Sequence, residues 1–303
     1  MILLAMALMG LVDNYVVVIA ETTGLWQFQV IRSGIALVCL AALARWRGWR
    51  LKPHRWGRVT ARSAVLSVAL MIYFTALALM PISEAVAGLF SAPIWVMILS
   101  ALVFARPVGP VRAAAAVLGF AGVLMVLRPD AGAVGWTSAL PLAAGLFYAL
   151  AQMATREWCA GEGAVTLLAG FFVAMGLWGV VGLGVLSVHP LPVAEGAAGW
   201  TTRLWGAMSP AAWGWTLAQA GFSLVAVGLI IRAYQTGEAS FVAVYEYALL
   251  IFAVLWGWLL LGDRIDGWAM AGIAAIVVSG AVIALRGTAP AAPADRGAAG
   301  IGR

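Results

Sequence analysis

Long apolar stretches follow one another along the chain, separated by short segments that carry charges, prolines and glycines. A helix needs about 20 apolar residues to cross a bilayer, because each residue adds about 1.5 Å to its length. We therefore predict ten spanning helices, at about 2–20, 25–44, 63–81, 84–104, 111–128, 136–155, 164–187, 211–233, 238–261 and 267–285. The pattern predicts an all-α polytopic membrane protein whose longest loop, about 188–210, is rich in turn-forming residues.

The composition also indicates a membrane protein. Apolar residues make up 64% of the chain and charged residues 10%, whereas soluble domains have roughly 45–50% and 25%. The 15 tryptophans and 35 glycines suit a bilayer, where Trp collects at the interfaces and Gly lets helices approach each other. The two cysteines cannot build a disulfide framework or a thiolate metal site, and both histidines lie beside prolines in predicted loops. We therefore expect no metal site and no cofactor.

The basic residues are distributed unevenly. Seven of the 18 lie between Arg45 and Arg62, in the predicted loop between the second and third helices, which is typical of a topology signal and not of a nucleic-acid-binding face. With the amino terminus in the cytoplasm, cytoplasmic segments hold 14 basic residues and outer segments hold 3, as the positive-inside rule requires. We therefore predict a protein of the cell inner membrane, embedded in lipid, with both termini cytoplasmic and no nucleic-acid partner. No Lys or Arg precedes Arg32, so the first stretch is interpreted as a helix and not as a signal peptide.

The chain contains an internal repeat. A shift of 158 residues aligns 93–128 with 251–286 without a gap, and the matches include Arg106/Arg264, Gly109/Gly267, Gly122/Gly280 and the closing Leu127-Arg128/Leu285-Arg286. Five spans per copy is an odd number, so the second copy enters the membrane from the opposite side. We predict two inverted five-helix repeats, 1–129 and 130–286, followed by a disordered cytoplasmic tail at 287–303. Inverted repeats are a recurring plan of secondary transporters, with the substrate site between the halves.

The sequence resembles the EamA-type transporters of the drug/metabolite transporter superfamily. The resemblance covers residues 2–286. Its carriers are the ten spans in two halves, Arg32 at the end of the segment 26–32, the helix-turn pair 76–93, and the ending 119–129 of the fifth helix. In the second half, Leu261-Gly262-Asp263 is similar to the Leu-Gly-Glu of the family. The sequence departs from the family at Ala105-Arg106, where the acid is missing, and at Ile251, where a proline is usual.

The resemblance implies a secondary transporter. The family includes amino-acid and metabolite exporters, among them the YddG-type exporters of aromatic amino acids, which we take as the closest characterised type. It also includes importers of compounds related to S-adenosylmethionine or riboflavin. The motifs identify the superfamily and say little about the substrate.

Two ionisable residues lie in the first two predicted helices. Asp13 is about 18 Å along the first helix and Arg32 about 10 Å into the second from the outer side, so both fall in the outer half of the bilayer. Each costs roughly 2.5–3.5 kcal/mol to insert alone, and pairing lets both remain charged. We expect a structural ion pair between Asp13 and Arg32, with a substrate-facing role for Asp13 left open.

The strongest candidate for substrate contact is Glu246, about 12 Å into the ninth helix from the inner surface. Tyr245 and Tyr247 flank it, and one of them could border the carboxylate. A buried carboxylate near an aromatic face suits a substrate ammonium, through charge pairing and cation–π attraction. The same carboxylate could carry a coupling proton, or it could bond to the backbone of a neighbouring helix.

Other polar residues recur at helical spacing. Such stripes line a cavity or serve packing, because Gly and Ser permit close approach of helices and Gln bonds across them. The stripes are Glu84, Gly88, Ser91 and Trp95; Tyr148, Gln152 and Thr155; and Trp215, Gln219 and Ser223. The candidate substrate-binding residues are thus Glu246, Tyr245, Tyr247, Asn14, Asp13, Ser91, Trp95, Tyr148, Gln152 and Gln219.

The sequence favours a secondary transporter for a small amphipathic metabolite, best exemplified by an amino acid with an aromatic or other apolar side chain, with export favoured over import. The alternative is an importer of an S-adenosylmethionine-like or riboflavin-like compound. No phosphate-binding Gly-x-x-x-x-Gly-Lys loop occurs, so we expect a coupling proton or an exchanged solute. A membrane-embedded enzyme, a channel and a structural subunit are remote alternatives, and the oligomeric state is not predicted.

Overall fold

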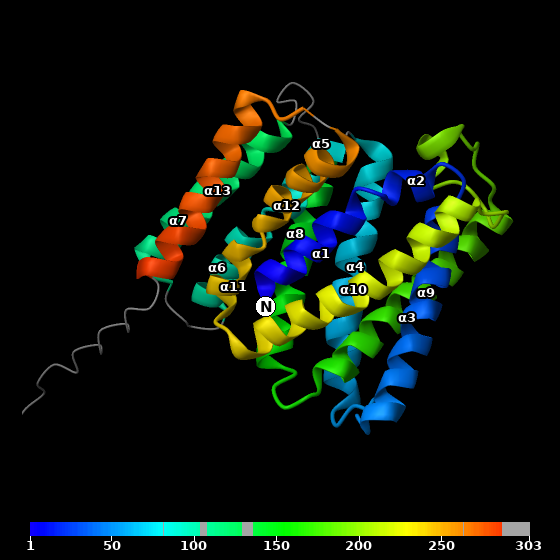
Figure 1. The fold of residues 1–303 in the computed structure, drawn as a ribbon. Helices are drawn as coiled ribbons and strands as arrows, with labels where there is room; N and C mark the ends of the chain where they lie inside the picture. The colour runs from blue at the N-terminus through cyan, green and yellow to red at the C-terminus, as the bar shows by residue number, and fades with distance from the viewer. Residues whose placement is uncertain (81, 104–107, 129–135, 263, 287–303) are drawn as a thin grey trace, which may run out of the picture.

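The computed structural model describes residues 1–80, 82–103, 108–128, 136–262 and 264–286. Long helices lie side by side in a bundle, and the described residues contain no strand (Figure 1). The predicted tail 287–303, the Ala105-Arg106 departure and Asp263 lie outside the described residues. The predicted all-α architecture is confirmed.

The helices follow the predicted spans closely. In chain order they are α1 (Ile2–Asp13), α2 (Val16–Ala20), α3 (Leu25–Arg47), α4 (Trp56–Leu79), α5 (Ile82–Leu89), α6 (Ala92–Leu102), α7 (Pro110–Leu127), η2 (Trp136–Ser138), α8 (Ala139–Glu157), α9 (Ala164–Val188), η3 (Gly196–Gly199), α10 (Pro210–Thr236), α11 (Ala239–Tyr245), α12 (Ala248–Trp256), η4 (Gly257–Leu261) and α13 (Gly267–Arg286). The short turns η2 and η3 are 3₁₀-helical, and η4 is a π-helical continuation of α12.

Nine helical segments in the described part of the chain are long and apolar enough to cross a membrane. The predicted span 136–155 is not among them, although it is present as the 19-residue helix α8. α8 packs against α4, α5, α6 and α10, so other helices cover much of its surface. A helix enclosed in this way can carry polar residues such as Gln152 and Thr155 because they face protein and not lipid.

Three of the predicted spans are interrupted. The helix breaks lie at Asn14-Tyr15 between α1 and α2, at Phe90-Ser91 between α5 and α6, and at Glu246-Tyr247 between α11 and α12. The predicted spans 2–20, 84–104 and 238–261 are present, and each contains a short break. At the first break the Asn14 amide donates to the carbonyls of Gly10 and Ala253, at 2.8 and 3.0 Å, which satisfies backbone oxygens at membrane depth.

Helices from the two halves of the chain pack together. α7 lies along α13, α3 along α9 and α4 along α8, and α1 packs against α10 and α12 (Figure 1). α7 and α13 run antiparallel, because Gly122 lies against Gly272 while Ala115, nearer the start of α7, accepts a 2.6 Å hydrogen bond from Ser279, nearer the end of α13. An Arg128–Asp266 ion pair joins the other ends of these helices.

Different connecting segments lie at the two ends of the bundle. We call the end that carries the connections 48–55, 158–163 and 237–238 the basic end. The opposite end is covered by residues 189–209, whose carbonyls and side chains hold the ends of α2 and α3. There Arg203 donates to the Ala20 carbonyl at 2.7 Å and the Trp26 indole to the Thr201 carbonyl at 2.9 Å.

The helix α4 begins at Trp56, seven residues before the predicted start at 63. Arg62 was predicted to lie in a basic loop, and this interpretation is wrong. It lies on the second turn of α4 and is only 1% exposed. The sequence alone could not place this start, because the groups that cap the helix come from a distant loop, as described below.

Candidate functional site

Glu246 lies at the break between α11 and α12, where the chain passes through the bundle interior. Its side chain is buried, at 7% exposure. The Tyr148 hydroxyl of α8 donates to its Oε1 at 3.1 Å, and Tyr234 of α10 is close enough to interact electrostatically with the same carboxylate. A carboxylate flanked by two phenols at a helix break can bind an ammonium group or hold a proton.

The predicted neighbours of Glu246 face other helices. The Tyr245 hydroxyl donates to the Gly280 carbonyl of α13 at 3.1 Å, and the Tyr247 hydroxyl donates to the Ala116 carbonyl of α7 at 3.4 Å. Successive helical residues point about 100° apart, so residues beside Glu246 in sequence are directed toward α7 and α13. The aromatic groups at the carboxylate come instead from α8 and α10.

The polar stripe predicted on α8 extends from Tyr148 along that helix. Tyr148 contacts Glu246, and one helical turn further Gln152 is buried with no hydrogen-bond partner for its Oε1. Thr155, a turn beyond, accepts a 2.8 Å hydrogen bond from Nε of Arg62, which also contacts the Leu167 carbonyl at 3.5 Å. We call Glu246, Tyr148, Tyr234, Gln152, Thr155 and Arg62 the core polar cluster.

Sequence reasoning missed Arg62 and Tyr234 as members of this cluster. Arg62 was grouped with a run of basic residues that marks topology, and the only signal that could have separated it is its position next to the apolar segment that follows. Tyr234 lies near the end of α10, where an interfacial aromatic residue is the usual interpretation.

Asp13 and Arg32 lie close enough for their charges to interact, but the ion pairs formed among the described residues do not include them, so the expected direct contact is absent here. Gln219 of α10 instead donates to Asp13 Oδ1 at 3.3 Å. Arg32 is buried, and its guanidinium lies 5.2 Å from the centre of the Phe28 ring. Asp13 is exposed, although α3 and α10 approach it.

The remaining candidate residues have packing roles in this structure. Ser91 donates to the Gly88 carbonyl at 2.6 Å, and both residues pack on α8 at Gly145. Trp95 packs on the buried apolar cluster around α8 and α10. Asn14 bridges α1 and α12 as described above. Among the described side chains of the polar stripes, those on α8 contact the buried charged residues Glu246 and Arg62.

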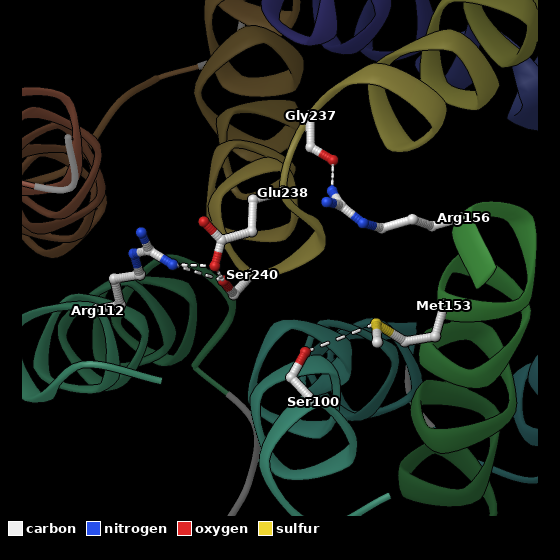
Figure 2. Close-up of polar contacts among 7 residues, drawn as sticks. All are labelled: Ser100, Arg112, Met153, Arg156, Gly237, Glu238 and Ser240. Carbon is white, nitrogen blue, oxygen red and sulfur yellow. Dashed lines mark hydrogen bonds and ion pairs between the residues drawn. The ribbon is translucent and has the colours of Figure 1, made fainter. Parts of the chain in front are cut away.

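Polar contacts close the bundle at the basic end (Figure 2). At the start of α7, Arg112 pairs with Glu238 and contacts the Ser240 hydroxyl of α11 at 3.3 Å. Arg156 at the end of α8 donates to the Gly237 carbonyl. Ser100 of α6 contacts the Met153 sulfur of α8 at 3.7 Å. We call these contacts the basic-end latch, because they join α6, α7, α8 and α11 at the basic end of the bundle.

A buried carboxylate anchors the loops at the same end. Glu162 accepts hydrogen bonds from the backbone N–H groups of His54 at 3.1 Å and Arg55 at 2.6 Å, and so caps the start of α4. Burial alone would raise the pKa of the Glu162 carboxyl, but these donors outweigh it and hold the pKa below its usual value. The negative charge is also favourable at a helix amino terminus.

We expect Glu162→Gln to destabilise the protein by about 1.5–3 kcal/mol near neutral pH, the range for hydrogen bonds to charged groups. Because the folded-state pKa lies below the unfolded-state value, the stabilisation is present above that unfolded value of about 4.5 and is lost as pH falls through the folded-state pKa. The difference in melting temperature between wild type and Glu162→Gln in detergent should therefore shrink below about pH 4.5. The exposed Glu195→Gln is the control, and a difference that stays constant with pH would contradict the capping role.

The described residues contain no group of three His, Cys, Asp or Glu side chains that could hold a metal ion. The side chains of the core polar cluster can recognise charge and exchange protons. Its position at the break of a membrane helix is one that transporters use for solutes.

Parts of the chain are similar to known transporters. Residues 1–128 match the EamA-like transporter family. A riboflavin transporter of Rhizobium johnstonii is 25% identical over 78% of this chain and 72% of its own length. A pseudopaline exporter of Pseudomonas aeruginosa is 25% identical over 82% of each chain.

A solved crystal structure has the same fold, with a TM-score of 0.76, 18% sequence identity and coverage of 94% of this chain and 96% of its own. The nine apolar helices fit a polytopic membrane protein, and the likeness shows that the fold is shared with the solved structure. Over residues 1–128 the chain matches the EamA-like transporter family, and over most of its length it is similar to proteins named as transporters.

Proposed function

We propose that the chain is a secondary transporter that moves a small amine-bearing metabolite, such as an amino acid, by alternating access between the halves 1–129 and 130–286. The observation that carries the substrate class is Glu246, a buried carboxylate with hydroxyl neighbours at a break in a spanning helix. A carboxylate in this position attracts cationic groups, because no cation of the described residues forms an ion pair with it.

The helix contacts support an inverted repeat. If α1–α2, α5–α6 and α11–η4 are each counted as one span, the five spans of one half correspond in order to the five of the other. α4 then packs on α8 as α10 packs on α1, and α5–α6 pack on α8 as α12 packs on α1. The equivalent helices α7 and α13 pack on each other, as do α3 and α9.

The helix breaks support a site between the halves. Phe90-Ser91 interrupts the fourth span and Glu246-Tyr247 the ninth, and these spans are equivalent under the repeat. Interrupted helices at corresponding positions mark binding sites in transporters, because the break exposes backbone groups and lets each half-helix tilt. The break that carries a charge, at Glu246, is the one to which we assign the substrate.

The positive-inside rule supports a cytoplasmic basic end. The basic-end latch then closes the cytoplasmic side, whereas Asp13, near the opposite half of the bundle, is exposed. We assign this structure to a state closed to the cytoplasm.

A second candidate substrate class is favoured by the relatives. Two riboflavin transporters, from Rhizobium johnstonii and Vibrio cholerae, match at 25% identity over 78% and 84% of this chain. A flavin-like or nucleoside-like solute would stack on aromatic rings such as the Tyr15–Trp215 pair, whose centroids lie 3.4 Å apart.

Counterflow into liposomes tests the proposal. Vesicles containing the purified protein are loaded with an unlabelled amino acid, S-adenosylmethionine or riboflavin and diluted into the labelled compound. Saturable, transient accumulation of an amine-bearing solute is expected. Accumulation of riboflavin alone would favour the second class, and no accumulation of any solute by folded protein would contradict a carrier.

A further inference from the structure

A cavity of about 370 Å³ lies at the basic end, between the ends of α8 and α10 and the start of α9. The apolar helix α9 begins at Ala164 and the apolar helix α10 ends at Thr236, so the cavity lies where the bundle leaves the hydrocarbon and meets the phospholipid headgroups. We call it the basic-end pocket. It is lined by the connection 160–163 and by Arg156, Arg232, Gln235 and Thr236.

Arg232 brings a positive charge to this pocket. It is exposed on α10, and among the residues that the structure describes its guanidinium has neither a hydrogen-bond partner nor a carboxylate within ion-pair distance. A basic residue in the last turn of a helix serves the carbonyls of the helix end, but α10 has no basic residue in its last turn. Capping of α10 therefore does not account for Arg232.

Arg156 is a second cation of the pocket. Its Nη1 donates to the Gly237 carbonyl (Figure 2), and its Nε lies 3.6 Å from Oε1 of Glu157. The side chain is still 27% exposed, and its Nη2 has no partner among the described residues. A guanidinium can hold a phosphate through two parallel N–H bonds. Arg156 can thus contact an anion in the pocket while it keeps its bond to Gly237.

The acidic residue of the pocket does not present its charge there. The side chain of Glu162 is only 2% exposed, and its carboxylate accepts the backbone N–H groups of His54 and Arg55. The connection also contributes Gly161 and Gly163, which have no side chain, at the amino terminus of α9. This end of a helix favours anions. The accessible charges of the pocket are therefore positive.

We propose that the basic-end pocket binds the phosphate of an anionic phospholipid headgroup in the adjoining leaflet. Two arginines beside a helix amino terminus suit a phosphate group, and the membrane surface supplies that group on a lipid. A zwitterionic headgroup carries its own ammonium, which the arginines repel. This lipid site is separate from the substrate site at Glu246 and does not depend on transport. Because Arg156 belongs to the basic-end latch as well, the bound headgroup lies beside the latch.

The test measures lipid binding to the purified full chain in neutral detergent. Dioctanoyl phosphatidylglycerol and dioctanoyl phosphatidylcholine, which have the same acyl chains, are titrated, and the melting temperature from intrinsic tryptophan fluorescence gives apparent affinities. We expect wild type to bind the phosphatidylglycerol about tenfold more tightly, with a smaller preference at about 1 M salt because exposed charges are screened. Equal affinity for the two lipids at low salt would overturn the proposal.

The variant Arg232→Gln assigns the site. Because no described residue contacts this guanidinium, the melting temperature without lipid should stay unchanged, while the affinity for phosphatidylglycerol should fall about tenfold. Arg232→Lys should retain part of the affinity. A lower melting temperature without lipid, together with unchanged lipid affinity, would show a structural role and overturn the proposal.

Arg45→Gln is the matched control. Arg45 is exposed in the last turn of α3, at the same end of the bundle but outside the pocket, so its replacement should change the lipid affinity by less than about twofold. Equal losses in Arg45→Gln and Arg232→Gln would mean that the whole basic end attracts anionic lipid without a defined site, and would overturn the pocket.

Inorganic phosphate separates a lipid from a free anion in the same titration. It should bind about tenfold more weakly than phosphatidylglycerol, because it lacks the acyl chains that hold the headgroup at the protein surface. Stabilisation by inorganic phosphate but not by phosphatidylglycerol would overturn the lipid as the ligand.

Discussion

Replacing Glu246 with glutamine should lower the rate of solute transport at least tenfold while leaving the amount of folded protein unchanged. Glutamine has the same size and can still accept the Tyr148 hydrogen bond of 3.1 Å, but it provides no negative charge for an ammonium group or a proton. Losing a charged hydrogen bond is worth about 1.5–3 kcal/mol, and each 1.4 kcal/mol is tenfold. The measurement is initial counterflow into liposomes, normalised to monodisperse protein.

Glu21→Gln is the matched control for this experiment. Glu21 lies at the end of α2 and is exposed, so the same chemical change there should leave transport within about twofold of wild type. Equal transport rates for Glu246→Gln and wild type would remove Glu246 from the substrate site. Loss of folded protein in Glu246→Gln would mean that its contacts with α8 and α10 are structural.

Replacing Gly122 with alanine should cause a large loss of stability. A Cβ at Gly122 would lie 2.6 Å from the Gly272 carbonyl oxygen of α13, a distance that requires α7 and α13 to separate. Overpacking of this kind costs about 1–3 kcal/mol. A lower melting temperature in detergent, measured by intrinsic tryptophan fluorescence, checks the prediction.

Gly184→Ala provides the control for Gly122→Ala. Gly184 lies within α9, and a Cβ there would meet nothing within 4 Å. Alanine stabilises a helix interior by about 0.5–1 kcal/mol relative to glycine, so Gly184→Ala should be neutral or stabilising. Equal effects of the two substitutions would show that the close approach of α7 and α13 does not contribute to stability.

Most of the fold could be predicted because the bilayer requires long apolar helices, and each such helix is visible as one contiguous apolar segment of the sequence. The helix breaks were harder to predict. Residues 238–261 are mostly apolar. The break at Glu246 depends on contact with α8, which is far away in sequence. The start of α4 was placed seven residues late for a similar reason, because its cap is Glu162.

The candidate site was predicted in part. Glu246 and the α8 stripe stand out because ionisable and amide groups are rare in membrane helices. Their partners could not be predicted, because Tyr234 and Arg62 reach the cluster only through the packing of α10 and α4 on α8. The flanking Tyr245 and Tyr247 were natural candidates by sequence, yet helical geometry turns them toward α13 and α7.

We propose that the basic-end latch closes the cytoplasmic side of the bundle and opens during transport. The most direct measurement is the reactivity of a cysteine at position 100 with a membrane-impermeant maleimide added at the basic end. The variant used for this measurement carries the substitutions Ser100→Cys, Cys39→Ala and Cys159→Ala, so that no other thiol remains. Ser100 is buried beside Met153, within the closed latch.

Labelling should be slow in this parent protein and at least tenfold faster when Arg112→Gln breaks the pair with Glu238. Arg128→Gln, which breaks the Arg128–Asp266 pair at the other end of α7, should leave labelling slow. Transported solute should speed labelling of the parent protein, because opening is part of the cycle. Equal labelling rates in the parent and in Arg112→Gln, with and without solute, would show that the basic-end latch does not close this side of the bundle.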